Sequence, residues 1–178
     1  PEEAVKALYV GRMTREKNIP FLLDIWKRVH HINKDIWLIM IGSGHYYGQR
    51  EAYEKYHIRF LGHREGKELA TLYASSDMFL FPSTTDTLGQ VVIEAMQSGL
   101  PVLVSDRGGP QTIVNQNTEN GLILHHSDAK AWVMAINALA KDEKRRKKLS
   151  ENGLNTAQKL TISESFDAFW SASCRDIS

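Results

Sequence analysis

The feature that most constrains the fold of this chain is an alternation between short, almost continuously apolar runs and longer segments with helical periodicity. Strands covered on both faces of a parallel sheet are apolar throughout, whereas half-exposed strands alternate apolar with polar residues. The runs therefore predict six buried strands, at Val5–Val10, Ile36–Ile41, Ile58–Leu61, Met78–Phe81, Val102–Ser105 and Gly121–Leu124.

Helical segments separate these strands and follow the last of them. Between the strands, the pattern predicts helices or helical turns at Asn18–His31, Tyr47–Tyr56, Lys67–Ser75, Leu88–Ser98 and Gln111–Val114. After residue 125 it is helical only, at Ala129–Ala140, Glu143–Lys159 and Ser163–Ala172. We predict an α/β fold: a doubly wound, mostly parallel six-stranded Rossmann-like sheet with right-handed crossovers and C-terminal helices.

Length and composition set limits on the class of protein. The 178 residues suit one domain, so we expect a single unit over residues 1–178, with strand–helix alternation over 5–125 and a helical part over 128–174. Lys and Arg number 22 against 21 Asp and Glu, and this balance argues against a nucleic-acid-binding protein. The one cysteine, Cys174, cannot form an internal disulfide, so we expect a reducing, cytoplasmic location.

In open α/β sheets, ligands bind beyond the carboxyl ends of the strands, so the residues after each strand are the most informative about function. Gly11 follows the first predicted strand, and Arg12 and Lys17 lie in the same strand–helix loop. Two cations at a helix N-terminus suit a phosphate group, because the free N–H groups and the helix dipole attract the same anion. From this segment alone, a phosphate site and a pair of exposed surface charges are equal alternatives.

The loop after the second strand carries Gly42-Ser43-Gly44, which resembles a dinucleotide-binding fingerprint. A Rossmann dehydrogenase needs an acidic residue after the next strand to bind the ribose, and Gly62-His63-Arg64 stands there instead. We therefore disfavour a dehydrogenase. The glycines let the backbone approach a ligand closely, or they simply turn the chain.

The segment after the fourth strand is the richest in polar signals. Thr87 and Gln90 have the spacing of a capping box, which predicts a helix directly after the strand. Backbone N–H groups near Leu88 and Gly89 would then face the cleft, ready for a phosphate or sugar oxygen. The same periodicity predicts a buried stripe of Leu88, Val91, Val92 and Ala95.

Two acidic residues of this segment have a plain and a functional interpretation. Asp86 suits a helix N-cap, and Glu94 shares a helix face with two glutamines, so periodicity alone favours a capping residue and a solvated one. A carboxylate on a cleft-facing helix is also well suited to accept hydrogen bonds from both ribose hydroxyls. The pair Gly108-Gly109 after the fifth strand forms a second close-approach loop, or only a turn.

Taken in order, these segments resemble the C-terminal, donor-binding domain of retaining glycosyltransferases of the GT-B fold, family 4 (glycosyl transferases group 1). The likeness runs from about residue 5 to residue 160 and keeps its order throughout. The matching pieces are Val10-Gly11-Arg12, Glu16-Lys17-Asn18, Gly42-Ser43-Gly44, Phe60-Leu61-Gly62, Glu68-Leu69, Leu72-Tyr73, Phe81-Pro82-Ser83, Gly89–Val102 and Gly108-Gly109.

The resemblance implies a site for a nucleoside diphosphate sugar. Arg12 and Lys17 would hold the diphosphate and stabilise the leaving group, and Asp86 would contact the donor hexose, which makes these three the catalytic residues. Glu94 would bind the ribose, as the second acid of the family's Glu-x7-Glu motif. Further donor contacts would come from Gly11, Gly42, Gly44, the loop Gly62-His63-Arg64 near the base, and Thr87, Leu88 and Gly89.

The sequence departs from the family pattern at two places. Asp86 changes the motif to Asp-x7-Glu, with a first carboxylate one methylene shorter, so the identity of the donor hexose is left open. Gln111-Thr112 replaces the acid often found after the glycine pair.

The implied reaction is transfer of a hexose, with retention, from a UDP- or GDP-linked donor to a sugar or lipid acceptor, as in polysaccharide or glycolipid biosynthesis. Because the chain has no Asp-x-Asp pair, we expect neither a metal ion nor another cofactor. Two alternatives stay open: a nucleotide-sugar epimerase of the same fold, and a non-catalytic nucleotide-sugar-binding module.

The acceptor would bind to an N-terminal domain that this chain lacks. The sequence begins with Pro1 rather than Met, and a strand follows at once, so we expect it to start inside a longer protein. The chain by itself is then expected to be inactive. Any membrane association, peripheral and at the inner face, would come through the absent domain, because no apolar run here approaches the roughly 20 residues that span a bilayer.

Overall fold

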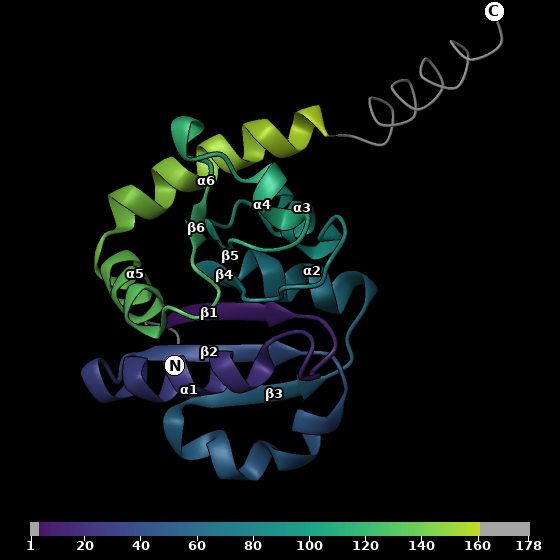
Figure 1. Ribbon diagram of the computed structural model, residues 1–178, viewed down its shortest axis with the longest axis vertical. Coiled ribbons are helices and arrows are strands. Elements are labelled where there is room, and N and C mark those ends of the chain that lie inside the picture. The colour runs from purple at the N-terminus through teal and green to yellow at the C-terminus, as the bar shows by residue number, and fades with distance from the viewer. Residues whose placement is uncertain (1–3, 161–178) are drawn as a thin grey trace, which may run out of the picture.

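A single parallel sheet forms the centre of the protein, as the sequence predicts. The computed structural model describes residues 4–160. Its strands lie in the order β3-β2-β1-β4-β5-β6, and all neighbouring pairs are parallel (Figure 1). Their bounds are β1 Val5–Val10, β2 Ile36–Ile41, β3 Ile58–Gly62, β4 Met78–Phe81, β5 Val102–Ser105 and β6 Leu122–Leu124. The predicted fold class is confirmed, and the strand ends differ from the predicted ones by one residue at most.

The helical segments follow the prediction less closely than the strands do. They are α1 Ile19–Ile32, η1 His45–Tyr56, α2 Gly66–Ala74, α3 Gln90–Gln97, α4 Pro110–Ile113, η2 Gln116–Thr118, α5 Ala129–Lys141 and α6 Glu143–Lys159. Segment η1 is a 3₁₀ helix, and α3 begins two residues later than predicted. The helix predicted at Ser163–Ala172 lies outside the described residues.

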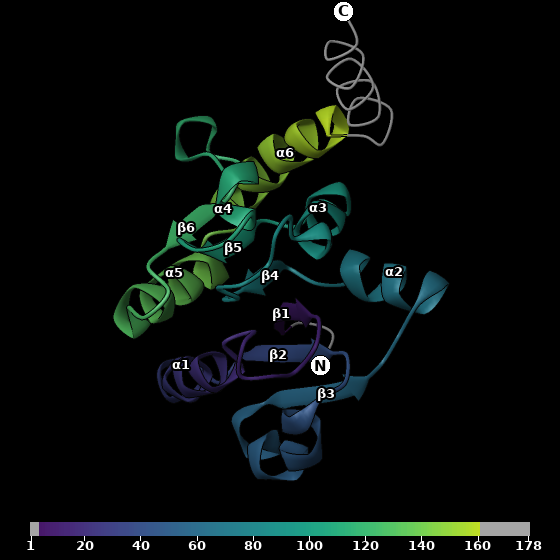
Figure 2. The same ribbon diagram turned by 45° about the vertical axis from the view of Figure 1, so that its right-hand side comes forward.

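Helices cover both faces of the sheet. The path from β1 to β2 and the path from β4 to β5 run in opposite directions across the sheet, so right-handed crossovers place α1 and α3 on opposite faces. Helix α5 packs beside α1, and α6 packs beside α3 (Figure 2). Strands β4 and β5 are fully buried between these two layers, which explains their continuous apolar runs, whereas the edge strands β3 and β6 are only partly buried.

Two tryptophans fill the layer that α1 and α5 form. Trp26 of α1 and Trp132 of α5 are fully buried, and each indole N–H donates to a backbone carbonyl at 3.1 Å, that of Tyr56 and that of His125 respectively. Leaving such a buried donor unpaired would cost about 1–3 kcal/mol. These bonds therefore fasten η1 and the segment after β6 to the helix layer.

The topology also fixes where a ligand can bind. Strand order reverses direction between β1 and β4, and because the strands are parallel their carboxyl ends share one edge of the sheet. The loops that leave β1 (residues 11–18) and β4 (residues 82–89) flank this switch point. Ligands of doubly wound sheets bind in the crevice there.

Candidate functional site

The start of α1 is tied to the loops that follow β4 and β6. Asn18 has a left-handed backbone with φ 58°, and it occupies the N-cap position of α1. Its side-chain N–H group donates to the Pro82 carbonyl at 3.3 Å and to the His126 carbonyl at 3.2 Å. A left-handed conformation is tolerated by asparagine better than by most residues. One side chain therefore brings three strand ends together and sets the position of Lys17 beside them.

Lys17 and Asp86 form an ion pair across the switch point. The Lys17 Nζ atom lies 2.7 Å from Asp86 Oδ1, and the two side chains are only 13% and 21% exposed. Arg12 is arranged differently: its guanidinium lies 2.7 Å from Glu16, and its side chain is 69% exposed. The structure thus brings Lys17 and Asp86 together as a shielded pair and leaves Arg12 on the surface of the same loop.

Buried polar atoms gather in the loops after β1 and β4. Thr14 Oγ1, Ser83 Oγ and Asp86 Oδ2 are buried and have no hydrogen-bond partner among residues 4–160. Buried polar groups are paired in nearly all native proteins, and each unpaired one costs about 1–3 kcal/mol. These three unpaired atoms lie in the two loops that flank the switch point, and a fourth, Asn137 Oδ1, lies in α5.

The glycine pair after β5 packs directly against the Asp86 loop. The Gly109 N–H donates to the Asp86 carbonyl at 2.7 Å. A Cβ atom at Gly108 would lie 2.7 Å from the Asp86 carbonyl oxygen, and one at Gly109 would lie 1.6 Å from that of Thr87. The close approach is thus between two loops of the chain itself, and it holds the backbone of Asp86 in place.

The capping box predicted for Thr87 and Gln90 is wrong. Helix α3 begins at Gln90, and its N-cap is Gly89, which has a left-handed backbone with φ 73°. A Cβ atom at Gly89 would lie 2.5 Å from the Pro110 ring, so only glycine fits against the segment after β5. The helix begins after this left-handed turn, at Gln90. Asp86 therefore lies too far from the helix to cap it.

The buried stripe of this helix also differs from the predicted one. Leu88 precedes the helix and is 54% exposed, so its assignment to the stripe is wrong. The buried residues of α3 are Val92, Ile93, Ala95 and Met96. Leu88 and Thr87 are both exposed beside Asp86, in the loop that faces the switch point.

Glu94 is held by a buried tyrosine. The Tyr73 hydroxyl donates to Glu94 Oε2 at 3.0 Å, and Tyr73 is 3% exposed. Burial and the neighbouring Glu94 charge raise the pKa of Tyr73, so its hydroxyl remains a donor at neutral pH. Glu94 also lines a hollow of about 260 Å³ between α2 and α3, together with Gly66, Leu69, Ala70, Tyr73, Gln97 and Ser98. It is therefore an oriented carboxylate at a groove, not a freely solvated residue.

The glycines after β2 serve contacts within the protein. A Cβ atom at Gly42 would lie 2.0 Å from the Gly11 carbonyl oxygen, and one at Gly44 would lie 2.6 Å from that of Met13. The Met13 N–H donates to the Ser43 carbonyl at 2.7 Å, so the two loops run side by side. This packing supports the loop that carries Arg12 and Lys17.

The predicted base loop lies at the surface beyond β3. Gly62 accepts a bond from the Gly42 N–H at 2.8 Å and has φ 72°. His63 Nε2 lies 3.5 Å from Glu65, and Arg64 Nε lies 3.4 Å from Glu68. The His63 side chain is 74% exposed and the Arg64 side chain is 39% exposed. Both side chains are thus accessible at the same edge of the sheet as Lys17.

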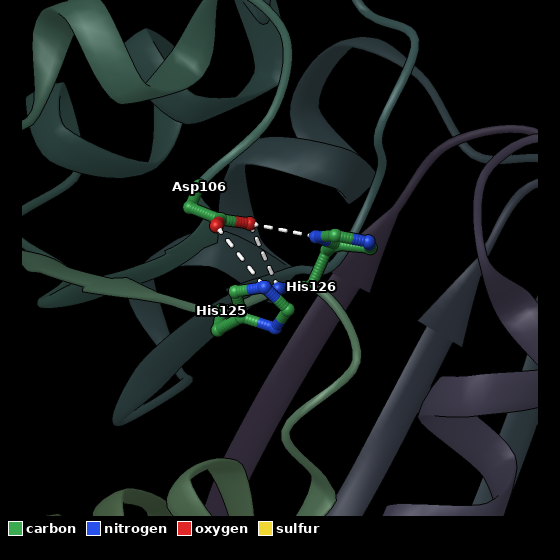
Figure 3. A group of neighbouring side chains, drawn as sticks. All are labelled: Asp106, His125 and His126. Carbon is green, nitrogen blue, oxygen red and sulfur yellow. Dashed lines mark hydrogen bonds and ion pairs between the residues drawn. The ribbon is translucent and has the colours of Figure 1, made fainter.

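Sequence reasoning missed a cluster formed by Asp106, His125 and His126 (Figure 3). Asp106 Oδ1 accepts the His126 backbone N–H at 2.8 Å and lies 2.9 Å from His126 Nδ1. His125 Nε2 lies 3.8 Å from Asp106 Oδ2. Asp106 directly follows β5 and the histidines directly follow β6, so the strand-end rule applied to the other loops would have found them.

The fold and these loops define a class of protein: a doubly wound α/β domain with the Lys17–Asp86 ion pair at the carboxyl edge of its sheet. The chain belongs to the glycosyl transferases group 1 family, whose sequence profile matches residues 1–156. This membership confirms the resemblance to group 1 at the level of the family. Among residues 4–160, no helix is both long and apolar enough to cross a membrane.

Curated relatives include transferases of several kinds. Over 152 residues the chain is 33% identical to sulfoquinovosyl transferase SQD2 of Arabidopsis thaliana, covering 82% of this chain and 28% of that protein. Over 141 residues it is 33% identical to a GDP-mannose-dependent alpha-mannosyltransferase of Corynebacterium glutamicum, covering 79% and 32%. The chain thus spans about a third of the length of these relatives.

Solved structures of glycosyltransferases share the fold. Sucrose-phosphate synthase from Thermosynechococcus elongatus superposes with a TM-score of 0.84 at 26% identity, covering 99% of this chain and 46% of that one. Anabaena Alr3699/HepE in complex with UDP superposes with a TM-score of 0.79 at 20% identity, covering 96% and 49%. The sheet and its flanking helices are therefore those of a GT-B half.

Proposed function

We propose that this chain is the donor-binding, C-terminal domain of a retaining family 4 glycosyltransferase. The whole protein transfers a hexose from a UDP- or GDP-linked donor to a sugar or lipid acceptor, without metal chemistry at the diphosphate. Family membership supports the reaction class, and the chain's match to about half of each solved relative supports a second, acceptor-binding domain.

The observation that carries this proposal is the shielded Lys17–Asp86 pair at the switch point. The pair joins the loop after β1 to the loop after β4, next to the buried and unpartnered Thr14 Oγ1, Ser83 Oγ and Asp86 Oδ2. A nucleoside diphosphate sugar offers what these groups lack: anionic oxygens for the lysine and hydroxyl donors for the carboxylate and the other oxygens.

The diphosphate leaves the donor sugar with growing negative charge, which Lys17 and Arg12 would offset. Lys17 is held near its position by Asp86, and the exposed Arg12 can turn from Glu16 toward a phosphate. The N-terminus of α1 adds its dipole to both cations. Fixed positive charge of this kind stabilises the leaving group without a metal ion, so added Mg²⁺ or Mn²⁺ should leave the transfer rate unchanged.

Glu94 would accept hydrogen bonds from the two ribose hydroxyls. The Tyr73 hydroxyl donates to Glu94 Oε2 at 3.0 Å and so orients the carboxylate. Glu94 lines the hollow between α2 and α3. Asp86 would contact the hexose, with the exposed residues Thr87 and Leu88 beside it. His63 and Arg64 follow β3, and we expect them to flank the base.

An epimerase of the same fold would bind the same donor but change its sugar without any acceptor. The family match and the named transferases among the relatives favour transfer over epimerisation. A non-catalytic binding module would keep these donor contacts and turn over nothing.

Product analysis of the full-length protein distinguishes the three functions. The protein is incubated with UDP- and GDP-linked hexoses, with and without candidate sugar and lipid acceptors. A glycoside that forms only with acceptor and keeps the donor's anomeric configuration supports the proposal. An altered sugar formed from donor alone would establish an epimerase instead, and intact protein that binds a donor but consumes none would support a binding module.

A further inference from the structure

We propose that Asp106, His125 and His126 form a binding site for a divalent transition-metal ion, of which Zn²⁺ is the best match. Two imidazoles and one carboxylate are a common catalytic-type zinc ligand set, which leaves a fourth position for water. This inference stands apart from the proposed transfer reaction, because none of the three residues belongs to the groups assigned to the donor.

The spacing of the three side chains suits one bound ion. Zinc binds imidazole nitrogen at about 2.0–2.1 Å and carboxylate oxygen at about 2.0–2.2 Å, so tetrahedral ligand atoms lie roughly 3.3–3.5 Å apart. Asp106 Oδ1 lies 2.9 Å from His126 Nδ1, and Asp106 Oδ2 lies 3.8 Å from His125 Nε2. Ligand atoms from the three residues all lie within 4.8 Å of one another. Bringing atoms from this upper limit to the tetrahedral spacing takes a relative shift of at most roughly 1.4 Å, which side-chain rotation can supply.

The backbone of both histidines is already fixed. The His126 N–H donates to Asp106 Oδ1 at 2.8 Å, and the His126 carbonyl accepts from Asn18 at 3.2 Å. The His125 carbonyl accepts from the Trp132 indole at 3.1 Å. A site whose ligands are held before the ion arrives loses less conformational freedom on binding, and therefore binds more tightly.

A second polar group orients the His125 ring. Ser127 Oγ lies 3.1 Å from His125 Nδ1, on the ring nitrogen that does not face Asp106. Metal-binding histidines almost always make such a bond with their other nitrogen, since it fixes the ring and its tautomer. Figure 3 shows both imidazoles turned toward the same carboxylate. The Ser127 backbone N–H also donates to His125 Nδ1 at 3.4 Å, so an ion at Nε2 requires this longer bond to break and the Nδ1 proton to be donated to Ser127 Oγ instead.

The ligand types and their exposure select the class of ion. Imidazole nitrogens favour Zn²⁺, Co²⁺, Ni²⁺ and Cu²⁺ over Mg²⁺ and Ca²⁺, which prefer oxygen. His125 is 56% exposed, so an ion can enter from solvent, whereas Asp106 and His126 are 30% and 29% exposed. A bound ion would link the loops after β5 and β6 and, through Asn18, the start of α1.

The test is calorimetric titration of the untagged, metal-free chain with Zn²⁺ at pH 7.5, and with Mg²⁺ in parallel. Every protein carries Cys174→Ser, which removes the only thiol. We compare this background with Asp106→Asn, His125→Ala and His126→Ala, and with the control His31→Ala, which removes an exposed imidazole of α1. Circular dichroism checks that each variant is folded.

The proposal predicts that one Zn²⁺ binds per chain. Its affinity should fall by at least about tenfold in each of the three variants and stay unchanged in the control. Zinc should also raise the melting temperature of the background protein, because it binds the folded state. Mg²⁺ should not bind, because it prefers oxygen ligands. A folded chain without zinc binding, or equal binding in the His125 and control variants, would overturn the proposal while leaving the proposed transfer function untouched.

Discussion

At the scale of single residues, the candidate site depends on charges whose positions are set by partners far away in the sequence. Lys17 and Asp86 are 69 residues apart along the chain, yet Nζ and Oδ1 are 2.7 Å apart. Both side chains are mostly shielded from water, which strengthens their attraction compared with a surface pair. Under the proposed function, Lys17 is paired with Asp86 in the free protein and contacts both Asp86 and the diphosphate when the donor is bound.

This pairing can be measured as a coupling energy. In a double-mutant cycle with Lys17→Met and Asp86→Asn, we expect an interaction of about 1 kcal/mol in the free energy of unfolding, read from urea titrations. The shielding of the pair is the reason for expecting more than a typical surface value. Strictly additive effects of the two substitutions would show that the ion pair contributes nothing to the fold.

A second prediction at this scale concerns Tyr73. Replacement of Tyr73 by Phe keeps the buried ring but removes the donor to Glu94, so the carboxylate loses its fixed direction. We expect nucleoside diphosphate affinity to fall by about tenfold, which corresponds to one lost hydrogen bond. The control is Tyr53→Phe, a ring that packs against Phe60. Equal affinity in the two variants would mean that Glu94 does not depend on Tyr73 for binding.

At the scale of elements, the loops after β4 and β5 form one unit. Gly109 lies so close to Thr87 that a Cβ atom would stand 1.6 Å from its carbonyl oxygen, whereas a Cβ atom at Gly48 of η1 would meet nothing within 4 Å. We expect Gly109→Ala to lower the free energy of unfolding by about 2–4 kcal/mol, because backbone must move. Gly48→Ala should change it by less than about 1 kcal/mol. Chemical denaturation of both variants checks this, and similar stabilities would refute the interlocked-loop description.

The same loops explain which parts of the structure the sequence could predict. The central strands β4 and β5 are recognisable because they are covered on both faces and are therefore apolar along their length. The start of α3 is not, because Gly89 is held in a left-handed turn by Pro110, a contact between segments that local patterns do not contain. The Lys17–Asp86 pair and the Asp106 cluster likewise depend on which strand ends become neighbours. The sequence analysis singled out Lys17 and Asp86 without pairing them, and it did not single out the Asp106 cluster.

At the scale of the whole molecule, residues 4–160 form a six-stranded sheet and its core, and under the proposed function they supply one side of the active site. It matches 46% and 49% of two solved relatives, so the proposed acceptor domain would account for the other half. We expect the chain alone to bind donor nucleotide and to transfer nothing, even at saturating donor and acceptor. Mass spectrometry of the products checks this, and any glycoside formed by the isolated chain would contradict a two-domain active site.

The most direct test of the central claim is calorimetric titration of the chain with UDP, GDP and ADP. The titration is repeated on Arg12→Ala, Lys17→Met and Glu94→Gln, with Lys130→Ala as the control for loss of an exposed lysine of α5. The account predicts that one diphosphate binds selectively, that each site variant binds it about ten- to a hundredfold more weakly, and that the control binds it normally. A folded chain that binds none of the three nucleotides, or site variants that bind as tightly as the control, would contradict a donor site at the carboxyl ends of β1 and β4.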